Sequence, residues 1–199
     1  MILNASWQDQ LLRTLNRFPY IKRSPRLAIL GIGNELCGDD SAGVLIAEAL
    51  QQQLNENQDV LVINAGTVPE NFVGVLRRFM PGLVLMVDSA RMGKSPGEVE
   101  WIKWENVTGV SVSTHTLPLN ITARYLVDEL DCEVTLIGIQ PDRITIGAPL
   151  SQEVQNTINE IISIIVNSLQ GTNQNSDINT RDTPSLLAEI DGLDKGFLP

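Results

Sequence analysis

The segment that most constrains the fold is residues 26–43, where an apolar run passes through a glycine-containing turn into two adjacent aspartates. Residues 27–30 are apolar without interruption, which is typical of a strand buried on both faces of a parallel sheet. Apolar residues then recur at helical spacing up to Leu50, so Asp39 and Asp40 lie where a strand gives way to a helix. Ligands of open α/β sheets bind at such positions. The segment therefore predicts a parallel sheet with a site at its edge.

A dinucleotide-binding turn is the first alternative, because Gly31 and Gly33 are spaced as in that motif and precede a helix. However, the third glycine would fall on Leu36, and Asn64 stands where an acidic residue should end the next strand. The two aspartates would also repel a pyrophosphate and attract a cation instead. Since only one of them can cap the following helix, the other requires solvent or a ligand to explain it.

The remaining central part of the chain alternates between apolar runs of strand length and amphipathic segments of helix length. Strands are predicted at 60–63, 83–87, 98–104 and 132–139, and helices at 69–80, 119–130 and 151–169. Short crossovers between the first three strands imply parallel strands with right-handed connections. The C-terminal ends of the first and third strands should therefore share one edge of the sheet. The alternating pattern at 98–104 is typical of a less buried edge strand.

The two ends of the chain differ from this alternation. Residues 5–18 carry apolar side chains on one helical face until Pro19, which predicts an N-terminal helical extension within residues 1–25. From Gly171 the composition turns polar, so residues 171–199 are predicted to form a flexible tail. Residues 26–170 should then form one globular domain.

Charge and cysteine content exclude several classes of protein. A net charge of −10 argues against nucleic acid or an anionic membrane as a partner. Cys37 and Cys132 form neither a CxxC pair nor a disulfide framework, and fit buried thiols in a reducing compartment. No apolar run reaches membrane-spanning length, and residues 1–25 lack the apolar core of a signal peptide. We therefore expect a cytoplasmic protein that is not bound to a membrane.

Three side chains could together form a metal site at the predicted sheet edge: Asp40 (or its neighbour Asp39), Asp88 at the end of the third strand, and His115 on a nearby loop. Each also has a structural interpretation, because Asp88 could turn the chain out of a buried strand and a single histidine in a chain is often structural or exposed. Two carboxylates and one imidazole suit a divalent transition ion and leave coordination positions open.

Six short motifs occur in order between about residue 26 and residue 169. They are Gly31-Ile-Gly-Asn34-Glu-Leu-Cys-Gly-Asp-Asp40-Ser-Ala-Gly43, Pro69-Glu-Asn71, Val87-Asp88, Pro96-Gly-Glu98, Thr114-His115-x-x-Pro118-Leu and Gly138-Ile-Gln-Pro-Asp142. Together they resemble the NiFe-hydrogenase maturation endopeptidases, most closely the type that processes the large subunit of hydrogenase 3. The resemblance implies a nickel-dependent endopeptidase that removes the C-terminal extension of a hydrogenase large-subunit precursor after nickel insertion.

The pattern and the resemblance together predict an α/β fold: a three-layer sandwich with a twisted, largely parallel five-stranded sheet and helices on both faces. Residues 26–170 would be a maturation-protease-like catalytic domain. The family's nickel ligands fall on Asp40, Asp88 and His115. The nickel would be supplied by the precursor, which would be the transient partner of a monomeric enzyme.

One motif departs from the family, because Asn64-Ala-Gly-Thr67 stands where the family usually has Asp-Gly-Gly followed by Ser or Thr. The missing carboxylate leaves open a non-catalytic assembly factor that binds nickel and docks the precursor without cutting it. Catalytic residues beyond the metal site are not assigned. The residues expected to border the substrate cleft are Gly33, Asn34, Asp39, Asn64, Gly66, Thr67 and Thr114.

Overall fold

The computed structural model of the chain describes residues 5–17, 24–106, 111–112 and 118–176. Its helices are α1 (Trp7–Arg17), α2 (Ala42–Leu54), α3 (Val73–Phe79), α4 (Leu119–Leu130) and α5 (Gln152–Ser176). Its strands are β1 (Leu27–Ile32), β2 (Val60–Gly66), β3 (Leu83–Arg91), β4 (Val99–Lys103), β5 (Ser111–Val112) and β6 (Glu133–Ile139). Short 3₁₀ helices are η2 (Gly38–Ser41), η3 (Pro69–Phe72) and η4 (Trp104–Asn106). Predictions that concern Thr114, His115 and the chain beyond residue 176 lie outside the described residues.

The strands form a mixed, mostly parallel sheet in the order β2-β1-β3-β6-β4. β1 runs parallel to both β2 and β3, and β3 runs parallel to β6, whereas the edge strand β4 is antiparallel to β6. The two-residue strand β5 pairs with the end of β3 outside this order. The predicted five-stranded, largely parallel sheet is confirmed, including the edge position of the strand predicted at 98–104.

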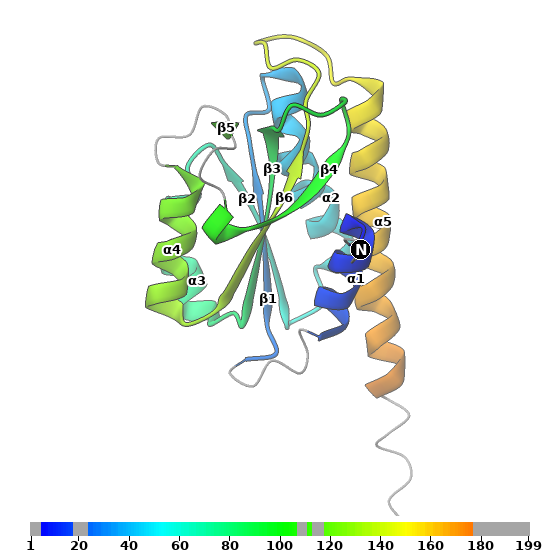
Figure 1. Cartoon of the computed structure of the whole chain (residues 1–199). Helices are drawn as coiled ribbons and strands as arrows, with labels where there is room; N and C mark the ends of the chain where they lie inside the picture. The colour runs from blue at the N-terminus through cyan, green and yellow to red at the C-terminus, as the bar shows by residue number, and fades with distance from the viewer. Residues whose placement is uncertain (1–4, 18–23, 107–110, 113–117, 177–199) are drawn as a thin grey trace, which may run out of the picture.

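Side chains of β1 alternate between the two faces of the sheet and so contribute to two cores. Leu27 and Ile29 pack in the core shared with α1, α2 and α5, whereas Ala28 and Leu30 pack in the core shared with α3 and α4. All six residues of β1 are buried, which explains their uninterrupted apolar run. Figure 1 shows these two groups of helices on opposite faces of the sheet. The predicted three-layer sandwich is therefore confirmed.

The start of α2 lies directly against the backbone of the sheet, and two glycines permit this contact. A Cβ atom at Gly43 would lie 2.2 Å from the carbonyl oxygen of Val87 and 2.3 Å from that of Ile32. A Cβ atom at Gly31 would lie 2.1 Å from the carbonyl oxygen of Gly43. Because all three distances are far below van der Waals contact, only glycine fits at either position. The close approach brings η2, and with it Asp40, against the ends of β1 and β3.

Two helix boundaries differ from the prediction. α5 continues through Gly171 to Ser176 instead of ending at Leu169, because a single glycine costs a helix only about 1 kcal/mol. The helix predicted at 69–80 is divided into η3 and α3, since Pro69 opens a 3₁₀ turn and Met80 ends the helix in a left-handed conformation. The N-terminal helix is confirmed as α1. Among the described residues, no helix combines the length and the apolarity needed to span a membrane.

Candidate functional site

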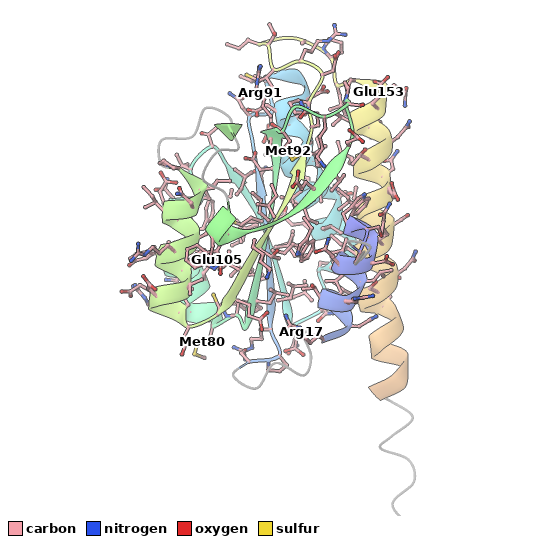
Figure 2. The ribbon with its side chains drawn as sticks, viewed as in Figure 1. Arg17, Met80, Arg91, Met92, Glu105 and Glu153 are labelled. Atoms are coloured by element: carbon pink, nitrogen blue, oxygen red, sulfur yellow. The ribbon has the colours of Figure 1, made fainter. Side chains whose placement is uncertain are left out.

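Asp40 and Asp88 both lie at the C-terminal edge of the parallel strands. Asp40 belongs to η2, and Asp88 lies in β3 directly after Val87, which pairs with Gly31 of β1. Both aspartates are completely buried. In Figure 2, Arg91 and Glu153 mark this end of the molecule, whereas Arg17 and Met80 mark the opposite end.

The carboxylate of Asp40 has one oxygen in a hydrogen bond and one that is available to a ligand. The hydroxyl of Ser89 donates to Oδ1 of Asp40 over 2.7 Å, which joins η2 to β3 and fixes the orientation of the carboxylate. Oδ2 of Asp40 is buried and receives no hydrogen bond from the described residues. Leaving a buried carboxylate oxygen without a donor costs about 1–3 kcal/mol. Such an arrangement is typical of a site whose partner is a bound ligand rather than the protein itself.

Asp39 is also fully buried, but its carboxylate is saturated by hydrogen bonds from the segment that connects β6 to α5. Oδ2 accepts from the backbone N–H of Asp142 at 2.8 Å, from that of Arg143 at 3.3 Å and from the hydroxyl of Ser151 at 2.9 Å. Oδ1 accepts from the backbone N–H of Ser151 at 2.7 Å. Asp39 therefore fastens a distant loop and the start of α5 to η2. Neither Asp39 nor Asp40 caps α2, whose N-cap residue is Ser41; its hydroxyl makes no capping hydrogen bond and donates instead to the carbonyl of Gly38.

Replacing Asp39 with alanine should lower the free energy of unfolding by about 3 kcal/mol, because partly buried backbone donors would lose a charged acceptor. Urea denaturation followed by circular dichroism measures the change. Asp142→Ala is the matched control, since that exposed carboxylate only pairs with Arg143 and its loss should cost less than about 1 kcal/mol. Equal stability of the two variants would show that the Asp39 carboxylate does not hold the loop.

Asn64 lies at the C-terminal end of β2 and bridges two carboxylates. Its Nδ2 donates to Oε1 of Glu35 and to Oε1 of Glu48, each over 3.2 Å, and its Oδ1 accepts from the backbone N–H of Gly66 at 3.1 Å. An aspartate at this position would supply no donor and would place three carboxylates together, which is electrostatically unfavourable. The amide is thus matched to the two glutamates of this particular chain.

The described residues predicted to border the cleft lie close together at this edge. The backbone N–H of Gly33 donates to the carbonyl of Gly66 at 2.9 Å, and that of Asn34 donates to the carbonyl of Asp40 at 3.2 Å. Thr67 follows directly after β2. These contacts gather the ends of β1 and β2 and the η2 turn into one surface, whereas Thr114 and His115 are not described.

A separate hollow of about 380 Å³ opens at the opposite end of the sheet, lined in part by Trp101, Trp104 and Cys132. None of the residues predicted for the site lines it. Burial raises the pKa of the Cys132 thiol to about 11, so this thiol stays protonated at neutral pH and is a poor nucleophile. Cys37 and Cys132 are both buried free thiols, as predicted.

Two of the three predicted metal ligands, Asp40 and Asp88, are among the described residues. Within the described part of the chain, no group of three histidine, cysteine or acidic side chains is arranged to hold a metal ion. Asp40 and Asp88 contribute carboxylates, and the third predicted ligand, His115, lies outside the described residues. Two buried carboxylates, one with an unengaged oxygen, fit a hard or borderline divalent cation that brings further ligands of its own.

Three residues that contact the candidate site were not predicted from the sequence. Ser89 orients Asp40. The sequence feature that could have indicated this role is a hydroxyl residue directly after an aspartate inside a buried strand. Glu35 and Glu48 accept hydrogen bonds from the side-chain amide of Asn64. Because Glu35 lies in a turn and Glu48 in α2, no sequence spacing relates them to β2.

Comparison with known proteins decides the family. The family model described as hydrogenase maturation protease (HycI) matches residues 44–168, more than half of the chain. The chain belongs to this family. A putative hydrogenase maturation protease of Methanocaldococcus jannaschii is 36% identical over 156 residues, which cover 75% of this chain and 92% of the relative. The hydrogenase 3 maturation protease of Escherichia coli K12 is 34% identical over 137 residues, covering 67% and 84%.

A solved structure of the same family supports the fold assignment. The crystal structure of the NiFe hydrogenase maturation protease HycI from Thermococcus kodakarensis superimposes with a TM-score of 0.70 at 34% identity. The superposition covers 79% of this chain and 99% of the Thermococcus kodakarensis chain. The predicted resemblance to hydrogenase maturation endopeptidases is therefore confirmed, and the protein is a peptidase. The family match begins at residue 44, so it includes Asp88 but starts just after Asp40.

Proposed function

We propose that the protein removes the C-terminal extension of a NiFe-hydrogenase large-subunit precursor once nickel has been inserted. The observation that carries the proposal is the pair of buried carboxylates at the sheet edge, where Oδ2 of Asp40 has no hydrogen-bond donor among the described residues. Membership of the maturation protease family supplies the substrate class.

In this proposal, Asp40, Asp88 and His115 bind the nickel that the precursor carries. Carboxylate and imidazole ligands suit a divalent transition ion, and three ligands from one protein leave positions for ligands of the precursor. Ser89 acts as a positioning residue, because its hydroxyl holds Oδ1 of Asp40 and leaves Oδ2 to the ion. The loop fastened by Asp39 and the Asn64 bridge then border the path of the precursor's C-terminal segment. Cytoplasmic location and the monomeric state stay predictions.

The direct test is to incubate the purified protein with nickel-loaded precursor and to record the masses of the products. The expected result is a large subunit that has lost one C-terminal peptide, together with that peptide. A stable complex with an uncut precursor would instead support the non-catalytic assembly factor. Neither cleavage nor binding of any hydrogenase precursor offered would contradict both functions.

A further inference from the structure

Two large apolar side chains are strongly exposed at the edge of the sheet that carries the candidate site. Leu36, in the turn between β1 and η2, is 71% exposed, and Ile146, in the connection from β6 to α5, is 79% exposed. These are the two highest values among the large apolar side chains of the described residues. The backbone N–H of Gly147 donates to the carbonyl oxygen of Leu36 over 2.8 Å, so the two segments lie side by side. We call Leu36 and Ile146 the apolar rim.

The apolar rim is held outward by a braced structure. The backbone N–H of Leu36 donates to Oδ1 of Asn34 at 3.0 Å, and Asp39 fastens the second segment through its four hydrogen bonds. A Cβ atom at Gly38 would lie 3.1 Å from the carbonyl oxygen of Arg143, which shows how closely the two segments approach. An apolar side chain on a loose loop can turn inward, whereas these two are kept in contact with water by their surroundings. Two exposed apolar side chains on adjoining segments beside a candidate site offer a partner an apolar contact.

The apolar rim is continuous with the candidate site. The turn that carries Leu36 is joined to Asp40 at both ends, because the N–H of Asn34 donates to the carbonyl of Asp40 and the N–H of Asp40 donates to the carbonyl of Cys37, each at 3.2 Å. In Figure 1 the connection from β6 to α5, which carries Ile146, lies at the top of the view, beyond the ends of β1 and β3. Leu36 and Asp40 therefore belong to one compact turn.

We propose that the apolar rim binds an apolar surface of the folded large-subunit precursor, beside the segment that carries nickel to Asp40. This inference rests on the proposed function. Contacts away from the reacting bond hold a substrate in register, and a few central apolar contacts often supply most of the binding energy of an interface. The rim would thus position the precursor while the carboxylates bind its nickel ion.

A second copy of this chain fits the structure less well. A stable dimer needs about 800 Å² from each partner, and two side chains supply only a fraction of that area. A folded substrate that is already bound at the adjacent site loses little further translational and rotational freedom when it also contacts the rim. We therefore favour this occupant.

The test is the double variant Leu36→Ser with Ile146→Ser, assayed with nickel-loaded precursor. KM should rise about tenfold, since apolar contacts are lost on binding, while kcat stays within about twofold of the wild type. Met80→Ser is the matched control, because Met80 is 62% exposed at the opposite end of the molecule and its loss should change neither constant. The conservative double variant Leu36→Met with Ile146→Leu should keep the wild-type KM. Thermal denaturation of each variant verifies that it is folded.

An unchanged KM in the serine variant, or an equal rise in Met80→Ser, would overturn the proposal. A dimer of the wild type that the serine variant loses, seen by light scattering, would assign the rim to a second copy instead and would also overturn it. If the wild type does not cleave the precursor, the proposed function fails separately, and calorimetry then measures binding of the uncut precursor. Weaker binding by the serine variant would support the rim, whereas equal binding, or no binding by the wild type, would overturn it.

Discussion

Asp40→Asn should abolish processing of the precursor while leaving the protein as stable as the wild type. Asparagine keeps the size of the side chain and an oxygen that accepts the hydroxyl of Ser89, so the link between η2 and β3 is retained. The substitution removes a buried negative charge and with it the carboxylate oxygen that receives no hydrogen bond from the described residues. We expect kcat/KM to fall by more than about 100-fold and the free energy of unfolding to stay within about 1 kcal/mol.

The measurement combines product masses from the cleavage assay with urea denaturation of the same preparation. Asp59→Asn is the matched control, because Asp59 is an exposed aspartate just before β2, at the opposite end of the sheet from the site. Asp88→Asn and His115→Ala should lose activity in the same way if the three residues share one ion. Normal processing by any one of these three variants would contradict the assignment of that residue.

The fold followed from the sequence wherever burial alone determines the pattern. β1 is buried along its whole length, and β3 is buried except for Arg91, so β1 and residues 83–87 of β3 appear as apolar runs. β4 lies at the edge and is only partly buried, which explains its alternation. Helix ends were less predictable, because Gly171 lies within α5 although glycine is a common helix terminator. Local propensity and tertiary packing compete at such positions.

The candidate site was predictable in its position but not in the roles of its residues. Asp39 and Asp40 are adjacent and chemically identical, yet one is saturated by protein donors and the other is not. The donors to Asp39 lie 103 to 112 residues further along the chain, so no local pattern could distinguish the two side chains. The same limit applies to Asn64, whose departure from the family pattern becomes understandable only beside Glu35 and Glu48.

The second large effect concerns the origin of the nickel. A tightly closed metal site needs a complete ligand set, usually with thiolates or several imidazoles. This chain has a single histidine and two cysteines, and the Cys132 thiol stays protonated at the opposite end of the sheet. Asp40, Asp88 and His115 could supply at most part of a coordination shell. The free protein should therefore hold divalent ions weakly, and the remaining ligands should come from the precursor.

Precursor prepared without nickel should accordingly remain uncut, whereas nickel-loaded precursor should be cleaved by enzyme that has been treated with a chelator and then freed of it. Under the proposed function, removing nickel from the substrate takes away the group that Asp40 and Asp88 bind, so cleavage should fall by more than about 100-fold. Product masses after a fixed incubation give the readout, and zinc-loaded precursor serves as the control for metal identity. Efficient cleavage of the metal-free precursor would show that the carboxylates do not read an ion on the substrate. A need to reload the treated enzyme with nickel before it cuts would show that the metal belongs to the protease, and the two aspartates would then be ligands of a resident ion.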